Sequence, residues 1–192
     1  MSSLPNAERR ALLALARRAI VEAVVNNRLL EIPSPAGALA RPSGAFVTLH
    51  HHGRLRGCIG QIEPVDSLAA TVARCAVSAA LEDPRFHPVT PEELGELEIE
   101  VSILSPLQPI RPEQIEVGTH GLIVTRGRMR GLLLPQVATQ YCWTRERFLE
   151  ETCVKAGLER DDWKDPAARI DAFTAEVFSE AELRSEQEAQ AS

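Results

Sequence analysis

A five-residue pattern occurs twice in this chain and constrains its fold more than any other feature. Gly-Arg-Leu-Arg-Gly at residues 53–57 is matched by Gly-Arg-Met-Arg-Gly at residues 127–131. Each copy follows an apolar segment with strand character and precedes a helical segment and a further strand. Such repetition predicts a duplicated supersecondary unit. We therefore expect an α+β fold of two pseudo-repeated hairpin–helix–strand units, with antiparallel sheets and packed helices.

Each copy of the pattern is expected to form a β-hairpin, with turns at His52-Gly53 and Arg126-Gly127. Glycine accepts the left-handed backbone conformations that two-residue hairpin turns require. A strand at residues 98–104 closes the first unit, and a strand at residues 173–178 is its expected counterpart. Ahead of the first of these strands, residues 90–93 read Thr-Pro-Glu-Glu, a capping box with proline at the first helical position.

The chain is predicted to form a single domain over residues 6–180. Its two halves span about residues 44–104 and 119–178, and a helix over residues 6–30, capped at its first residue, precedes them. That helix is amphipathic, because its apolar residues recur at three- and four-residue spacing. Residues 181–192 are polar and are expected to form a fraying tail.

Residues 55–60 read Leu-Arg-Gly-Cys-Ile-Gly, which sets a thiol between two glycines and close to a guanidinium. Glycine weakens a strand and usually marks a close approach of backbone or ligand, so this segment is not built for packing alone. The hexapeptide resembles the hallmark of the AMMECR domain family, called AmmeMemoRadiSam system protein A in prokaryotes. Further blocks similar to the family follow in the same order at residues 83–88, 99–104, 134–138 and 155–158, with Trp163 beyond them.

The resemblance covers nearly the whole predicted domain and implies a cytosolic α+β protein whose biochemical activity is unsettled. Prokaryotic members of the family are encoded beside a Memo-like dioxygenase relative and a radical-SAM protein. The resemblance therefore implies Memo-like and radical-SAM proteins as partners. It offers no established catalytic residue to carry over, so whether the protein is an enzyme stays open at this point.

The composition excludes several classes of protein. A net charge of −6 and 4% aromatic residues disfavour nucleic acid as a partner. No apolar run is long enough to cross a membrane, and the run at residues 11–16 is cut by Arg17-Arg18, unlike a signal peptide. The cysteines form no C-x-x-C pair, which fits a cytoplasmic location. No Walker loop, dinucleotide fingerprint, nucleophile elbow or zincin motif is present, so no cofactor is expected.

Cys58 is the first candidate for chemistry. The repeat supplies an internal control, because Cys58 corresponds to Leu132 in the second copy and the hairpin itself does not require a cysteine. Arg56 shares a face with Cys58 on a regular strand and would stabilise the reactive thiolate. In the alternative, a two-residue turn pairs Cys58 with Val47 and Arg56 with Leu49, which makes the cysteine a small inert core residue.

Glu100 and His87 are candidates for moving protons beside Cys58. Glu100 lies on the polar face of its predicted strand, and His87 lies in a proline-held loop. Each observation has a plainer interpretation. A polar strand face is solvated by default, and the loop is explained if Asp83 and Arg85 pair to anchor it.

Ligand binding has candidates of two kinds. Gly57 and Gly60 allow close approach of a ligand to the backbone, and Arg85 and Lys155 carry positive charge for an anion. Lys155 also has a structural explanation, because a cation near a helix C-terminus is favourable and Gly157 suits the left-handed cap.

Three successive histidines at residues 50–52 suggest metal binding, because His50 and His52 would share a strand face. The middle histidine would face away, however, and His52 falls in the predicted turn. No third ligand stands at a recognisable spacing. The sequence therefore predicts no metal site, and an exposed hairpin tip instead.

Two functions remain. The first is an enzyme, or a component of one, that acts on a small anionic metabolite, with Cys58 as thiolate nucleophile and Arg56 as its activator or as an anion ligand. The second is a non-catalytic ligand-binding or adaptor protein that works with Memo-like and radical-SAM partners. The reactivity of the Cys58 thiol discriminates between them.

Overall fold

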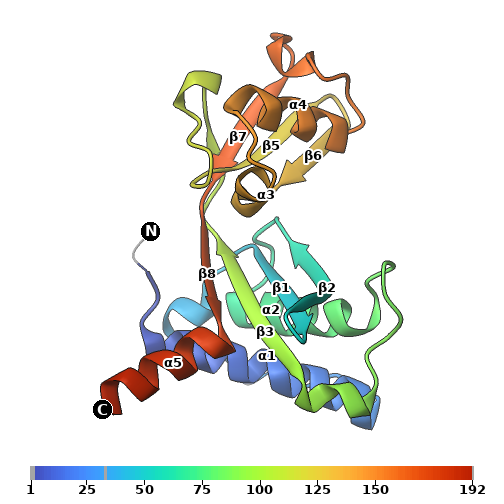
Figure 1. The fold of residues 1–192 in the computed structure, drawn as a ribbon, viewed down its shortest axis with the longest axis vertical. Coiled ribbons are helices and arrows are strands. Elements are labelled where there is room, and N and C mark those ends of the chain that lie inside the picture. The colour runs from blue at the N-terminus through green and yellow to red at the C-terminus, as the bar shows by residue number, and fades with distance from the viewer. Residues whose placement is uncertain (1–2, 33, 192) are drawn as a thin grey trace. The chain divides into compact units, whose positions relative to one another are not determined.

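The computed structural model describes residues 3–32 and 34–191, and its helices and antiparallel sheets confirm the α+β class (Figure 1). By its internal contacts the chain divides into two compact units. The first comprises Met1–Leu104 with Glu176–Ser192, and the second comprises Ser105–Ala175. The divide after Leu104 coincides with the end of the first predicted half.

The first unit is built on a four-stranded sheet in the order β2-β1-β3-β8. Strand β1 (Ala45–His51) is antiparallel to both β2 (Arg54–Gln61) and β3 (Leu97–Leu104), and β8 (Ala175–Ser179) forms the far edge. Side chains of β1 alternate between buried and half-buried positions. The two faces of the sheet therefore differ, as expected where only one face is fully covered.

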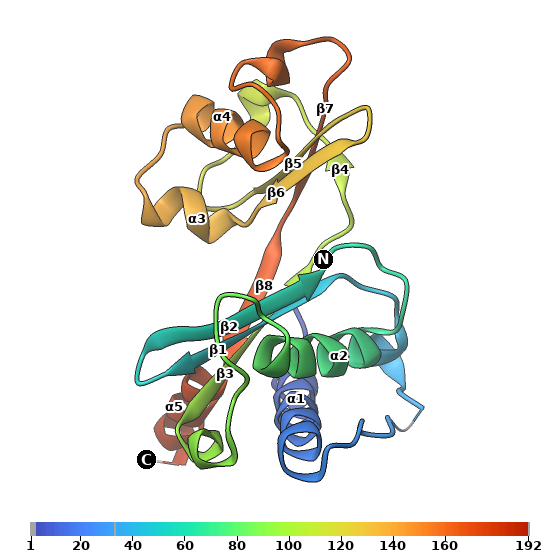
Figure 2. The same cartoon turned by 90° about the vertical axis from the view of Figure 1, so that its right-hand side faces the viewer.

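Helices α1 (Asn6–Asn26) and α2 (Leu68–Leu81) pack on one face of this sheet and enclose the core (Figures 1 and 2). Helix α1 contributes apolar side chains at helical spacing, which include Leu12, Ala16 and Ile20. Helix α5 (Glu180–Ala191) adds Leu183 to the same core.

The second unit repeats this plan on a smaller scale, with the sheet order β4-β7-β5-β6. Helices α3 and α4 pack on β5 and β6 and enclose a separate core that includes Phe148 and Leu149. The elements are β4 (Gln108–Pro109), β5 (Gly121–Arg126), β6 (Met129–Leu133), α3 (Pro135–Gln140), α4 (Arg145–Lys155) and β7 (Arg169–Phe173). None of the helices in the described ranges is long and apolar enough to span a membrane.

Short 3-10 helices connect these elements. The capping box predicted at residues 90–93 is confirmed, and it begins one of them, η2 (Pro91–Gly95). The Glu93 carboxylate accepts a hydrogen bond from the Thr90 backbone N–H at 2.8 Å, as the capping box requires. The others are η1 (Gly37–Ala40), η3 (Pro112–Gln114) and η4 (Asp162–Lys164).

Both copies of the repeated pattern form hairpins, with two-residue turns at His52-Gly53 and Gly127-Arg128. The turn glycines have positive φ angles of 73° and 61°. The second turn therefore lies one residue later than predicted. The cause is a β-bulge in the first hairpin, where the register shifts between Leu49 and His50 and leaves Arg56 as the extra residue.

The repeated glycine of each hairpin lets a helix approach closely. A Cβ on Gly57 would overlap the carbonyl oxygen of Ala79 in α2. In the second unit, a Cβ on Gly131 would overlap the backbone of Ala156 at the end of α4. Glycine is thus required at these positions by the packing of helix on hairpin, because no side chain fits between the two backbones.

The strand predicted at residues 173–178 is corrected by the structure. The counterpart of β3 is β7, which pairs with β5 as β3 pairs with β1. The chain leaves the second sheet after Phe173 and joins the first sheet as β8. Because apolar residues lie both before and after this change of sheet, the sequence pattern resembled that of one continuous strand.

The predicted ends of the domain also change. The polar tail predicted at residues 181–192 is helical to residue 191 as part of α5, because Leu183 is only 3% exposed and anchors it; residue 192 lies outside the described residues. Helix α1 ends at Asn26, before the predicted residue 30. Its first residue, Asn6, makes no capping hydrogen bond and instead donates through Nδ2 to Glu186 at 2.9 Å.

Candidate functional site

Cys58 lies on the face of the first sheet that α1 and α2 do not cover. Its neighbour Gly57 faces α2, and successive strand residues point to opposite faces. In register, Cys58 pairs with Thr48, and Thr48 pairs on its other side with Glu100. The alternative pairing of Cys58 with Val47 is therefore wrong, because the β-bulge shifts the register by one residue and turns the thiol away from the core.

A carboxylate and a guanidinium hold the backbone of Cys58. Asp83 Oδ2 accepts a hydrogen bond from the Cys58 N–H at 2.8 Å, and Arg85 Nη2 donates to the Cys58 carbonyl oxygen at 3.2 Å. Arg85 also forms a bidentate ion pair with Asp83, with N–O distances of 2.9 and 2.6 Å. These contacts occupy the outward N–H and C=O of an edge strand. The expected Asp83–Arg85 pair thus fixes the loop directly against the hairpin.

The charges around Cys58 depend on this pair. The Arg85 guanidinium, and then the backbone N–H groups of Cys58 and Arg85, hold the pKa of the buried Asp83 carboxyl well below its usual range. Asp83 raises the pKa of Arg85, and the Cys58 side chain raises it further. Arg85 is therefore a cation beside the thiol. Its side chain is 54% exposed, so the guanidinium is accessible from solvent.

Arg56 has a different environment from the one expected. Its guanidinium forms a bidentate ion pair with Glu93, with N–O distances of 2.7 and 3.0 Å, and Nη1 donates to the His87 carbonyl oxygen at 2.9 Å. Arg56 lowers the pKa of Glu93 to about 2. Its side chain is 14% exposed. As the extra residue of the bulge, Arg56 ties the hairpin to η2 and the preceding loop, so its charge is neutralised.

The polar face predicted for β3 is present, with Glu100 half-buried on it. Burial raises the pKa of the Glu100 carboxyl, and His50 opposes part of this rise. Thr48 lies between Glu100 and Cys58 in the register, and its hydroxyl donates to Cys58 Sγ at 3.3 Å. The face therefore presents a thiol, a hydroxyl and a carboxyl on three adjacent strands.

The loop after α2 borders a hollow of about 430 Å³ beside the hairpin. Its lining includes Arg56, Arg85, Phe86 and His87. The His87 side chain is exposed at this hollow, while its carbonyl oxygen holds Arg56. The loop that carries His87 is therefore next to the Cys58 hairpin, as expected.

The remaining ligand candidates have structural explanations. Gly60 pairs with Phe46, and a Cβ on Gly60 would overlap the Phe46 ring. Lys155 is the last residue of α4, and Gly157 follows with a positive φ of 77°, as the helix-end interpretation of Lys155 expects. Lys155 belongs to the second unit, whereas Cys58 belongs to the first.

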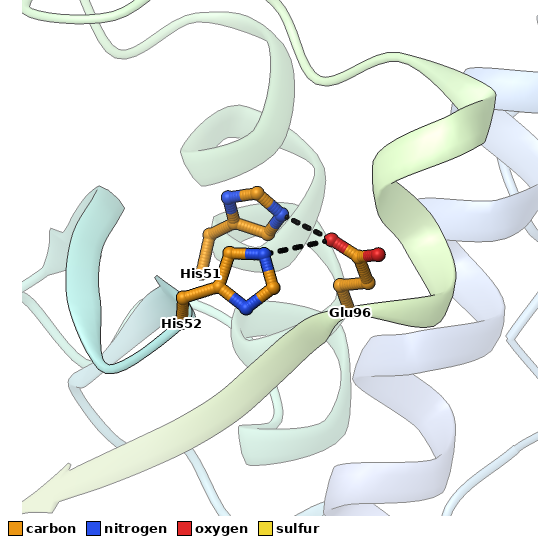
Figure 3. A group of neighbouring side chains, drawn as sticks. All are labelled: His51, His52 and Glu96. Atoms are coloured by element: carbon orange, nitrogen blue, oxygen red, sulfur yellow. Dashed lines mark hydrogen bonds and ion pairs between the residues drawn. The ribbon is translucent and has the colours of Figure 1, made fainter.

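Two histidines and a glutamate converge at the tip of the first hairpin (Figure 3). Glu96 Oε2 lies 2.8 Å from His51 Nε2 and 3.0 Å from His52 Nε2. The group contains His51 in place of the His50 that strand alternation suggested, and Glu96 had no signal in the sequence. His52 has a positive φ of 52°, so strand alternation fails and its ring turns to the same side as His51.

The comparisons with known proteins agree with this fold. The sequence matches the AMMECR1 family model over residues 13–178. The chain belongs to the AMMECR1 family. A protein of Methanothermobacter thermautotrophicus is 47% identical over 90% of this chain and 94% of its own length. A protein of Thermofilum pendens is 41% identical over 94% of this chain and 93% of its own length.

A solved structure is also similar to this AMMECR1-family chain. The crystal structure of uncharacterized protein PH0010 from Pyrococcus horikoshii matches it with a TM-score of 0.83 and 42% sequence identity. The match covers 91% of this chain and 92% of that one. This similarity confirms the fold of the present chain across nearly its whole length.

Three residues of the AMMECR1-family hexapeptide have structural roles. Arg56 holds Glu93, Gly57 admits α2, and Gly60 makes room for Phe46. Cys58 has no packing role of this kind, because its side chain lies on the uncovered face. Thr48, whose hydroxyl bonds the thiol, was not predicted, because cross-strand neighbours have no signal in linear spacing.

Proposed function

We propose that this AMMECR1-family protein is an enzyme, or a component of one, that acts on a small anionic metabolite through the Cys58 thiol. The observation that carries the proposal is the position of Arg85. Its guanidinium is bound to the Cys58 carbonyl oxygen, interacts with the Cys58 side chain, and is exposed enough for an anionic ligand to reach it. Arg85 thus replaces Arg56 in the role that the sequence suggested for Arg56.

The proposed roles follow from the positions of three groups. In this proposal the Thr48 hydroxyl, which donates to Sγ in the structure, turns to accept the Cys58 thiol proton and passes its own proton to the carboxylate of Glu100, its partner in register. The thiolate lone pair then forms a bond to an electrophilic carbon of the ligand. The leaving group departs with its bonding electrons and takes the proton from Glu100, whose raised pKa suits both steps. His87, exposed at the neighbouring hollow, is the second candidate for this proton transfer.

The experiment compares an anionic with a neutral alkylating agent. Iodoacetate and iodoacetamide react at the same carbon, so a cation that attracts anions raises the ratio of their rates at the nearby thiol. Exposed Cys142 serves as the internal control. We expect Cys58 to show a higher iodoacetate-to-iodoacetamide ratio than Cys142 in peptide mass spectrometry. Arg85→Gln should reduce that ratio to the control value, whereas Arg56→Leu should leave it unchanged.

Equal ratios at Cys58 and Cys142, or no labelling of Cys58 in the folded protein, would contradict the proposal. Arg85→Lys separates charge from shape, because lysine keeps the positive charge and loses the bidentate pair with Asp83. A ratio retained in Arg85→Lys supports an electrostatic effect of the guanidinium on the incoming anion.

The alternative is an adaptor that works with Memo-like and radical-SAM partners. It is favoured by the absence of an imidazole or carboxylate bound directly to Cys58 Sγ in the described ranges, where Thr48 is the side chain that bonds it. Gel filtration with purified Memo-like and radical-SAM proteins tests the alternative. An adaptor should form a stable complex that survives Cys58→Ala. We also propose a cytoplasmic location, which the four free cysteines support.

A further inference from the structure

The tip of the first hairpin carries a second site, separate from Cys58. We propose that His51, His52 and Glu96 bind a divalent transition metal ion of the Zn²⁺ class. The three residues each offer one ligand atom, and these atoms lie within 4.8 Å of one another (Figure 3). Two imidazoles and a carboxylate form a donor set that suits zinc and related ions rather than Mg²⁺ or Ca²⁺.

The spacing of the ligand atoms is close to what a tetrahedral ion needs. Bonds of about 2.0–2.2 Å arranged tetrahedrally place ligand atoms about 3.3–3.6 Å apart. Glu96 Oε2 now lies 2.8 and 3.0 Å from the two imidazole nitrogens, and the two rings are centred 4.2 Å apart. Small side-chain rotations that open these contacts would therefore admit an ion between the three atoms.

The backbone holds the three residues in place. His52 adopts a left-handed conformation in a two-residue turn, which directs its ring toward that of His51. Glu96 directly follows η2, and the Arg56–Glu93 ion pair fixes η2 to the same hairpin. The ligands thus come from two segments that are already joined, so binding does not have to order a loose loop.

The group is open to solvent, so an ion can reach it from outside the protein. Glu96 is 56% exposed and His52 is 70% exposed. Three protein ligands at such an open position leave a fourth place for water or a ligand, as in catalytic rather than structural zinc sites.

The test uses the full-length protein without an affinity tag and measures Zn²⁺ binding by isothermal titration calorimetry. We expect one ion per chain, with Co²⁺ giving the visible absorption of a tetrahedral complex. Glu96→Gln and His51→Gln should each weaken Zn²⁺ binding at least tenfold. His52→Asn should do the same, since asparagine tolerates the left-handed turn but loses the imidazole.

The control variants are His50→Gln and His87→Gln, which remove histidines outside the group. Both should keep the affinity of the parent protein. Thermal unfolding with and without Zn²⁺ supplies an independent readout, because an ion that binds only the folded state raises the melting temperature. The site is refuted if the affinity of His52→Asn equals that of the parent, or if His50→Gln loses as much affinity as Glu96→Gln.

Discussion

The Asp83 carboxylate, in the loop after α2, accepts a hydrogen bond from the backbone N–H of Cys58 in β2 at 2.8 Å. The Asp83 side chain is 2% exposed, while its ion-pair partner Arg85 is 54% exposed. One buried carboxylate therefore sets the position of the candidate nucleophile and orients the neighbouring cation at the same time.

Asp83→Asn should lower the free energy of unfolding by about 2–4 kcal/mol, the range for removing one partner of a buried charged hydrogen-bond group. The amide keeps an oxygen acceptor but loses the charge that holds Arg85. Urea unfolding at neutral pH measures the loss. The rate of Cys58 alkylation should also change, because the contacts of Asp83 and Arg85 to the Cys58 backbone both depend on Asp83. An Asp83→Asn protein as stable as the parent would contradict this.

The Asp83 carboxylate should also make the free energy of unfolding depend on pH. The folded pKa of Asp83 is lowered from 3.8, so the unfolded chain takes up this proton first as the pH falls. The stabilisation by Asp83 is complete above about pH 4–5 and is lost progressively below that. Below this pH, the free energy of unfolding of Asp83→Asn should consequently fall less steeply with decreasing pH than that of the parent.

Arg56 and Glu93 should behave as a structural pair. Arg56→Leu and Glu93→Gln should each destabilise the protein, and a double-mutant cycle should give a coupling energy of about 1–3 kcal/mol for this largely buried bidentate pair. The pKa of Glu93 falls from 4.5 to about 2, so the stabilisation holds above about pH 4.5 and is lost between there and pH 2. Additive losses in the cycle would show that the two residues act independently.

The fold was predictable where local signals and tertiary structure agree. The hairpins, the capping box at η2 and the amphipathic α1 all follow from turn chemistry and periodicity. The bulge at Arg56 was not predictable, because it is fixed by the ion pair to Glu93, which is distant in sequence. That single residue reversed the face on which the thiol lies.

Gly57→Ala should be strongly destabilising, by about 3 kcal/mol or more, because the new methyl group meets the backbone of α2 rather than a flexible side chain. Gly95→Ala is the matched control. A Cβ on Gly95 has open space around it, and its φ is not positive. Its free energy of unfolding should change by less than about 0.5 kcal/mol. Similar values for the two variants would refute the close approach at Gly57.

The sequence predicted that the loop with Asp83 and Arg85 lies beside the Cys58 hairpin, but it did not predict the partner of Arg56. The contrast between Cys58 and Leu132 in the repeat made Cys58 a candidate, since packing needs recur in both copies and chemistry does not. The exchange of roles between Arg56 and Arg85 could not be predicted, because both lie near Cys58 and only the fold decides which carboxylate each one meets.

Cys58→Ala and Cys75→Ala should separate a site cysteine from a core cysteine. Cys58 is half-buried on the uncovered face, so its replacement should cost less than about 1 kcal/mol of stability. Cys75 is 3% exposed in the first core, and its loss should cost about 1–2 kcal/mol through missing contacts. Burial raises the pKa of the Cys75 thiol to about 11, which suppresses its alkylation at neutral pH.

In a Cys142→Ser background, which removes the exposed thiol, Cys58 should therefore react first and Cys75 and buried Cys153 only on unfolding. Urea unfolding and timed alkylation of the same samples check both halves of this prediction. If Cys58 reacts only on unfolding and Cys58→Ala costs as much stability as Cys75→Ala, the thiol is a packing residue. The proposed enzyme would then lose its nucleophile, and the adaptor would become the better account of the hexapeptide, in which Arg56 and Gly57 serve structure alone.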